Sequence, residues 1–217
     1  MNFKELFPLQ VVINLDKRPD RLKICMEEEF PKIRINPIRK PGVVVEQIEN
    51  SWWRGAIGCL LSHYHILQSA MLLNTNVFIF EDDVDFKNIN SLELLNLCCD
   101  DLNNRDWDMF YLSVNVMKPF YKVSNLLAKL NSGQSTVAYG VNKNFIGKLL
   151  NYIQLDKIDA PIDLIYSERV IPNHNVFVSC PMLAIQRDNF SDIENSEVKY
   201  SDYLEKRYWE NLRENDE

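Results

Sequence analysis

The hydrophobic pattern along the chain alternates between strand-like and helix-like segments. Short apolar runs rich in β-branched and aromatic residues predict buried strands, at 9–15, 77–80, 107–112, 135–139, 176–178 and 182–185. Apolar residues spaced by three or four positions predict helices, after Pro19, at 55–73, 91–97, 143–153 and 160–170, and in the charged tail from Tyr200. This alternation indicates an α/β fold in which helices cover a sheet.

Two segments break this pattern. Residues 30–53 are interrupted by proline and glycine, so we expect a short strand near 33–38, an added edge strand at 43–45 and an otherwise irregular path. Residues 113–131 show no regular period. A connection of this length inside a compact domain is usually functional or mobile, so we expect it to form a lid or a loop that faces a substrate.

An acidic group follows the apolar strand within V-F-I-F-E-D-D-V-D-F at 77–86. In open α/β sheets, ligands bind at the carboxyl ends of the strands, so chemistry is expected here. Neighbouring carboxylates repel one another, and a divalent cation with oxygen ligands is the simplest partner for them. The alternative is a solvated acidic turn that caps the next helix. The carboxylates are those of Glu81, Asp82, Asp83 and Asp85.

A cationic turn connects the first strand to the helix that begins near Pro19. Amide groups at a helix N-terminus, together with arginine, make an anion site, so Asn14, Arg18 and Arg21 are candidates to bind a phosphorylated ligand. We expect Arg21 to be a surface arginine that contributes little to stability. The alternative is that these are ordinary exposed residues at a helix start. No glycine-rich phosphate loop follows the strand, which disfavours a dinucleotide or P-loop site.

The helix at 55–73 and the residues before it carry further candidates. Gly55 and Gly58 permit close approach of backbone or ligand. His63 lies one turn into the helix, but the spacing of histidine and cysteine does not favour a zinc site. Trp52 and Trp53 can stack on a sugar ring, although a tryptophan is more often a core or interface residue.

Composition narrows the class of protein. The 217 residues suit one domain, and 46% hydrophobic with 25% charged residues is ordinary for a globular protein. A net charge of -7 disfavours a nucleic-acid partner. Neither a transmembrane segment nor a signal peptide is recognisable. The five cysteines form no C-x-x-C pair, which fits reduced thiols in a cytoplasmic compartment.

Five spaced motifs together resemble glycosyltransferase family 25, which includes lipooligosaccharide and collagen hydroxylysine galactosyltransferases. The resemblance covers about residues 10–194. Two positions depart from the family pattern, because Ala56 stands where Glu is common and Leu67 where an aromatic residue is common. The motifs are V-I-N-L-D-K-R-P-D-R at 12–21, G-A-I-G-C-L-L-S-H-Y at 55–64, F-I-F-E-D-D-V at 78–84, P-I-D at 161–163, and Gln186 followed by S-D-I at 191–193.

The resemblance implies a single GT-A-like nucleotide-sugar transferase domain over residues 1–217, with a mixed, mostly parallel sheet flanked by helices. Its nucleotide-binding part would span about 9–112, its acceptor side about 113–194 and a charged tail 195–217. The implied reaction moves a hexose, galactose or glucose, from a UDP-sugar to a hydroxyl of a glycan, lipooligosaccharide or glycoprotein acceptor.

The resemblance also assigns residues. Glu81 and Asp83 would hold Mn²⁺ or Mg²⁺ as the outer members of an acidic triplet. Asp163 is the carboxylate of a separate motif and is the expected general base for an inverting transfer, although a carboxylate in a first helical turn can simply complement the helix dipole. The residues expected to hold or flank the nucleotide-sugar are Asn14, Leu15, Arg18, Arg21, Gly55, Gly58, Ser62, His63, Asp82, Gln186 and Asp192.

Two other classes of function remain open from the sequence. One is a homologue that binds a nucleotide-sugar or carbohydrate without catalysis. The other is a phosphatase-like hydrolase that uses Asp83 and Asp85 as nucleophile and acid. The hydrolase leaves the cationic turn and the 55–64 motif unexplained.

Overall fold

A nine-stranded mixed sheet forms the centre of the computed structural model, which describes residues 1–87, 91–191 and 196–214. The strand order is β15-β7-β8-β11-β5-β10-β3-β1-β2. Three two-stranded sheets, β12-β4, β13-β14 and β6-β9, accompany it. The strands are β1 Leu9–Asn14, β2 Ile38–Pro41, β3 Val77–Glu81, β4 Val84–Phe86, β5 Met109–Tyr111, β6 Asn115–Val116, β7 Phe120–Lys122, β8 Leu127–Lys129, β9 Gly133–Gln134, β10 Ala138–Val141, β11 Val176–Ser179, β12 Ala184–Gln186, β13 Asn189–Ser191, β14 Ser196–Val198 and β15 Leu212–Arg213.

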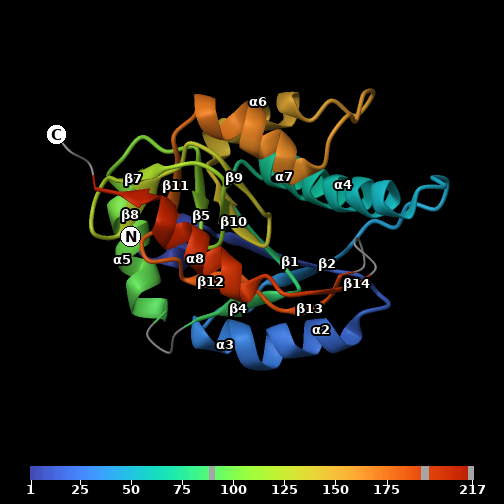
Figure 1. Cartoon of the computed structure of the whole chain (residues 1–217), viewed down its shortest axis with the longest axis horizontal. Coiled ribbons are helices and arrows are strands. Elements are labelled where there is room, and N and C mark those ends of the chain that lie inside the picture. The colour runs from blue at the N-terminus through green and yellow to red at the C-terminus, as the bar shows by residue number, and fades with distance from the viewer. Residues whose placement is uncertain (88–90, 192–195, 215–217) are drawn as a thin grey trace.

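Helices cover both faces of the large sheet (Figure 1). One face carries α4, α6 and α7, and the other carries α2 and α3. The helices are α1 Phe3–Leu6, α2 Pro19–Ile24, a π-helical turn Cys25–Glu29, α3 Phe30–Lys32, α4 Ser51–Leu72, α5 Ser91–Asn103, α6 Lys143–Tyr152, α7 Ile162–Ile165, a π-helical turn Tyr166–Val170, a 3₁₀ turn Ile171–Asn173 and α8 Ser201–Asn211.

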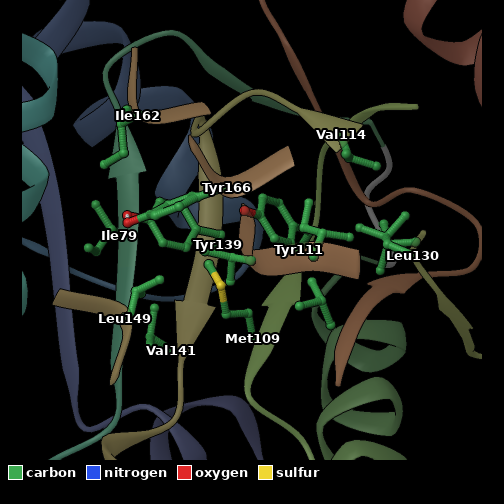
Figure 2. Close-up of a cluster of buried hydrophobic side chains, with 14 of the residues drawn as sticks. Ile79, Met109, Tyr111, Val114, Leu130, Tyr139, Val141, Leu149, Ile162 and Tyr166 are labelled. Atoms are coloured by element: carbon green, nitrogen blue, oxygen red, sulfur yellow. Dashed lines mark hydrogen bonds between the residues drawn. The ribbon is translucent and has the colours of Figure 1, made fainter. Parts of the chain in front are cut away.

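Successive residues of the central strands enter two separate cores, because side chains of a strand point alternately to opposite faces. On β3, Ile79 joins the core beneath α4, α6 and α7, while Phe78 and Phe80 join the core on the other face. Figure 2 shows the first of these cores, in which the rings of Tyr111 and Tyr139 stack with centroids 5.5 Å apart. The sheet is therefore buried on both sides, as the unbroken apolar run of β3 predicted.

The expected α/β fold with a mixed sheet flanked by helices is confirmed. In the nine-stranded sheet, however, four of the strand pairings among the described residues are parallel and four are antiparallel, so this sheet is not mostly parallel. The reason is topological. β10 runs antiparallel between β3 and β5, and β7 and β8 form an antiparallel pair near the other edge.

The two aperiodic segments differ from expectation. The strand near 33–38 is instead β2, Ile38–Pro41, and residues 43–45 form no strand. Residues 113–131 are not an irregular loop, because they contain β6, β7 and β8. These strands are two or three residues long, too short to show a period, and they form by pairing with distant segments such as β11. Among the described residues, no helix combines the length and apolar character needed to cross a lipid bilayer.

Two glycines provide a matched test of the packing. A Cβ at Gly140 on β10 would lie 2.4 Å from Phe7 and 2.8 Å from Phe78, whereas a Cβ at Gly147 on α6 meets no atom within 4 Å. Gly140→Ala should lower the free energy of unfolding by about 1–3 kcal/mol through overpacking. Gly147→Ala should raise it by about 0.5–1 kcal/mol, since alanine favours a helix over glycine. Denaturant unfolding of both variants checks this, and equal effects would contradict it.

Candidate active site

Two adjoining cavities lie at the carboxyl end of β3. The first, of about 550 Å³, is lined by the ends of β1 and β3, the segment 42–45, the first turns of α4 and residues from 186 onward. The second, of about 610 Å³, is lined by the start of α4, the segment 134–136, the start of α7 and the start of α8. Both volumes are in the range of small-molecule sites. Cys59, Glu81 and Gln186 line both cavities.

A buried ion-pair network organises the acidic strand end. Asp82 and Asp83 form the turn between β3 and β4. Arg21 of α2 places its Nη2 2.5 Å from Oδ2 of Asp83. Its Nε lies 3.0 Å from Oδ1 of Asp82, a contact that is electrostatic rather than a well-aligned hydrogen bond. Asn14, the last residue of β1, donates its Nδ2 to Oδ2 of Asp82 at 2.7 Å.

The expectation that Arg21 is a surface residue is wrong. Its exposed fraction is 8%, and its guanidinium lies against the buried carboxylates of Asp82 and Asp83. Burial alone would lower the pKa of Arg21, but Asp83 and Asp82 raise it above the ordinary value. Burial in turn raises the pKa of Asp82 to about 6 and raises that of Asp83, while Arg21 opposes both shifts.

Glu81 is held separately, on the side facing α4. Its Oε1 accepts a hydrogen bond from Thr136 Oγ1 at 2.6 Å and lies 3.2 Å from Nε2 of His63. The other ring nitrogen, Nδ1, is 2.9 Å from the hydroxyl of Tyr139 on β10. Burial opposes ionisation of Glu81, yet the contacts with His63 and Thr136 lower its pKa below the ordinary value. The Glu81 carboxylate is therefore ionised and fixed in orientation.

Glu81 and Asp83 offer carboxylate oxygens, the donor type that a hard divalent cation prefers. Oδ2 of Asp83 is engaged by Arg21 and accepts a hydrogen bond from Gln186 Nε2 at 3.0 Å. Its Oδ1 is buried and has no hydrogen-bond partner among the described residues. A buried, ionisable oxygen without a donor is costly unless a cation joins it.

A second metal-competent group was not expected from the sequence. Atoms of Cys59, His63 and Glu81 lie within 4.8 Å of one another. The spacing of Cys59 and His63 in the sequence could have predicted this group. Cys59 precedes His63 by four positions on α4, and residues four positions apart share a face of a helix. Burial raises the pKa of the Cys59 thiol well above its ordinary value. Metal binding would have to displace the thiol proton, and Glu81 belongs both to this group and to the acidic group of the strand end.

Asp163 opens α7 and lines the second cavity but not the first. Its Oδ1 accepts a hydrogen bond from the backbone N–H of Leu164 at 2.8 Å, so it does complement the helix start. Burial, and then the nearby charge of Glu81, raise the pKa of Asp163, although the Leu164 hydrogen bond opposes this.

Ser62 and Gly58 shape the first cavity through the backbone. The Ser62 hydroxyl donates to the Gly58 carbonyl at 2.7 Å and accepts from the Val43 N–H at 2.8 Å. A Cβ at Gly58 would lie 2.5 Å from the Val43 carbonyl oxygen. The close approach expected at Gly58 is therefore to the segment 42–45, which forms a wall of the cavity.

The first cavity gathers most of the predicted residues. Arg18 is not among its lining residues, because it pairs with Asp20 and donates to the Phe190 carbonyl. Asp192 lies outside the described residues. Three cations in the lining were not assigned a role from the sequence, although Lys17 lies within the quoted 12–21 motif and Arg54 and Arg187 each neighbour a motif residue. The predicted residues in the lining are Asn14, Leu15, Arg21, Gly55, Gly58, Ser62, His63, Glu81, Asp82, Asp83 and Gln186.

Comparison with known proteins identifies the family of this site. The family model described as glycosyltransferase family 25 (LPS biosynthesis protein) matches residues 47–166, more than half of the chain. The chain belongs to glycosyltransferase family 25. The matched segment of this family 25 chain includes α4, the acidic end of β3 and Asp163. Family membership agrees with the expected nucleotide-sugar transferase fold.

Similar family 25 proteins are longer than this chain. Procollagen galactosyltransferase 2 of Mus musculus is 21% identical over 204 residues, which cover 82% of this chain and 32% of that protein. An inactive glycosyltransferase 25 family member 3 of Mus musculus is 33% identical over 116 residues, which cover 51% of this chain and 19% of that protein. The chain thus spans about a third of the length of the first relatives it matches.

Among solved structures, a glycosyltransferase involved in glycosylation of the major capsid of PBCV-1 is similar to this family 25 chain, with a TM-score of 0.44 and 14% identity. The similarity covers 87% of this chain and 97% of that structure.

Burial of the ion pair predicts a large stability effect at Arg21. Arg21→Ala should lower the free energy of unfolding by about 3–5 kcal/mol, because it leaves Asp82 and Asp83 buried without their cation. Lys23→Ala on the same helix is the control, since its pair with Glu27 is exposed, and it should change stability by less than about 1 kcal/mol. Urea unfolding without added metal measures both. Similar values for the two variants would show that the network does not stabilise the fold.

Proposed function

We propose that the chain is a metal-dependent glycosyltransferase that moves a hexose from a UDP-sugar to an acceptor hydroxyl with inversion. The observation that carries this proposal is the meeting of the two cavities at Glu81 and Gln186. One cavity combines cations with the acidic group, and the other holds a separate carboxylate, Asp163. A displacement at an anomeric carbon needs groups that stabilise the leaving diphosphate on one side of that carbon and a base for the acceptor hydroxyl on the other side.

The first cavity is the proposed donor site. Its cations can pair with a diphosphate through charge-assisted hydrogen bonds. Arg187 supports this assignment, because its Nη1 is buried without a hydrogen-bond partner among the described residues, while its Nη2 pairs with Glu29 at 3.1 Å. The galactosyltransferase names of the relatives favour galactose as the hexose, and glucose is the alternative. The four cations are Lys17, Arg21, Arg54 and Arg187.

Glu81 and Asp83 are the proposed ligands for Mn²⁺ or Mg²⁺. When bound, such an ion would neutralise charge on the departing diphosphate. Arg21 and Gln186 orient the Asp83 carboxylate, and His63 and Thr136 orient that of Glu81. These contacts hold the oxygen atoms in place without a loop movement.

Asp163 is the proposed general base. The acceptor oxygen forms a bond to the anomeric carbon, and the bond from that carbon to the diphosphate oxygen breaks with its electron pair leaving on UDP. The acceptor proton passes to the Asp163 carboxylate. The raised pKa of Asp163 increases its proton affinity toward that of a base working near neutral pH.

In this proposal the expected division into a nucleotide-binding part at about 9–112 and an acceptor side at about 113–194 is modified. Gln186 and Arg187 also line the donor cavity, and the start of α4 and the start of α8 also line the acceptor cavity. A glycan or glycoprotein hydroxyl is the acceptor, and no nucleic acid takes part. A reducing, cytoplasmic location is also proposed, supported by the five cysteines, all of which are free.

The two alternative functions receive different support. A phosphatase-like reaction would need Asp85 beside Asp83, but the Asp85 carboxylate faces Lys32 at 3.6 Å and lines neither cavity. A non-catalytic homologue has a precedent in the inactive mouse relative. Turnover of a UDP-hexose separates this alternative from the proposed transferase.

Asp83→Asn tests the metal ligand while preserving shape. It should abolish the part of UDP-hexose affinity that depends on Mn²⁺, since a neutral amide replaces the charged oxygen. Asp85→Asn is the matched control, because Asp85 lines neither cavity. Isothermal titration with UDP-hexose, with and without Mn²⁺, measures both variants. Retention of Mn²⁺-dependent binding by Asp83→Asn, or full activity in excess chelator, would reject the assignment.

Asp163→Asn tests the base. It should lower the turnover number by roughly 100- to 10,000-fold while the dissociation constant for UDP stays unchanged. Asp156→Asn, an exposed carboxylate outside both cavities, is the control and should leave turnover unaltered. A product that retains the donor's anomeric configuration would contradict the assigned mechanism.

The same two variants test the pH dependence of kcat/KM. Only ionised Asp163 accepts a proton, so kcat/KM should rise with pH through its pKa and then level. Because that pKa is raised, the midpoint of this rise in kcat/KM, the acidic limb of the pH profile, should lie above pH 3.8, the ordinary carboxyl pKa. The limb should disappear in Asp163→Asn and persist in Asp156→Asn.

A further inference from the structure

The two cavities differ sharply in charge. The first is lined by four cations, whereas the described residues that line the second include no lysine or arginine. The carboxylates of Glu81, Asp159 and Asp163 line the second cavity; Asp159 pairs with Arg169, and Glu81 pairs with His63 when that ring is protonated. The guanidinium of Arg207 lies over the Tyr203 ring, 5.2 Å from its centroid, but it does not line the cavity. A phosphate or carboxylate on the acceptor would therefore face like charge with no lysine or arginine in the described lining to compensate it. The second cavity therefore disfavours anionic acceptors.

Aromatic side chains from two distant parts of the chain line this second cavity. Trp52 and Trp53 begin α4 and meet edge to face, with centroids 5.3 Å apart. Tyr200 and Tyr203, at the start of α8, have centroids 5.8 Å apart. A sugar ring has an apolar C–H face and a polar edge, a combination that aromatic side chains with a polar group can match.

The polar lining of this cavity consists mainly of uncharged groups that both donate and accept hydrogen bonds. Gln134 and Ser135 are half-buried there, beside Thr136. Amides and hydroxyls of this kind pair with sugar hydroxyls, which have the same dual character. Ser135 also has a φ of 98°, a conformation rare outside glycine and concentrated at ligand sites.

We propose that the acceptor is an uncharged saccharide, that its ring packs on Trp53 and Tyr203, and that its reacting hydroxyl faces Asp163. This inference rests on the proposed function and names the acceptor class for the same site. Trp53 and Tyr203 are specificity-determining residues in this assignment. They contact the part of the acceptor that does not react.

An acceptor panel with UDP-galactose, UDP-glucose and Mn²⁺ tests the inference. The neutral arm contains methyl β-glucoside, methyl β-galactoside and lactose. The anionic arm contains methyl β-glucuronide, and the cationic arm a hydroxylysine-containing peptide. Release of UDP above the acceptor-free rate is measured for each. The neutral arm should give at least tenfold higher kcat/KM than the other two. Preference for the glucuronide or the peptide, or no transfer to any neutral saccharide, overturns the inference.

Three variants sharpen the test. Trp53→Ala and Tyr203→Ala should each raise KM for the best neutral acceptor about tenfold, with the dissociation constant for UDP-hexose unchanged. Trp209→Ala is the matched control on α8, because Trp209 is half-exposed and lines neither cavity. An effect of the control equal to that of the two variants would overturn the assignment of these residues.

A gain-of-function variant covers the case in which an aromatic substitution disturbs folding. Gln134→Lys introduces a cation into the second cavity and should increase kcat/KM for methyl β-glucuronide at least fivefold relative to methyl β-glucoside. An unchanged ratio overturns the charge argument. Binding of UDP-hexose and its slow hydrolysis without acceptor report the proposed function separately. If both are present and the panel fails, the acceptor class alone is wrong, and if both are absent, the proposed function falls and the inference with it.

Discussion

The buried ion pair between Arg21 and the carboxylates of Asp82 and Asp83 is the constraint on which the site depends. Two adjacent carboxylates at a buried strand end repel each other and lose hydration, so they persist only if a cation accompanies them. Arg21 supplies that cation from the neighbouring helix α2. The network therefore joins the first strand, the cationic turn and the acidic turn into one rigid unit. That unit forms the floor of the first cavity.

Two carboxylates that line the second cavity, those of Glu81 and Asp163, lie in opposing environments. Glu81 receives hydrogen bonds from His63 and Thr136, and its pKa is lowered despite burial. Asp163 is buried near that charge, and its pKa is raised. Carboxyl groups separated in this way can take different roles at one pH, one as a permanent anion and one as a proton acceptor. The sheet supports the difference, because Tyr139 on β10 fixes the ring of His63.

The site is assembled from segments that are far apart in sequence. Residues near positions 14, 54, 81 and 187 meet in the first cavity, and the starts of α4, α7 and α8 meet in the second. Glu81 and Gln186 stand between them. The proposed transfer between two substrates needs such a shared boundary, and the contrast in charge on its two sides would separate a phosphate-bearing donor from an uncharged acceptor.

The sequence by itself determined the α/β class, the two-sided burial of β3 and the location of the acidic group, because these follow from local apolar runs and from where they end. Most of the residues that it predicted to bind the nucleotide-sugar or the metal ion line the first cavity. Only the tertiary structure decided the strands within 113–131, since pairing with distant partners creates them rather than local propensity. It likewise decided the burial of Arg21 and the presence of Tyr203 and Trp53 in the lining of one cavity. Both depend on how separate helices pack against the sheet, and packing between distant segments leaves no local periodicity in the chain.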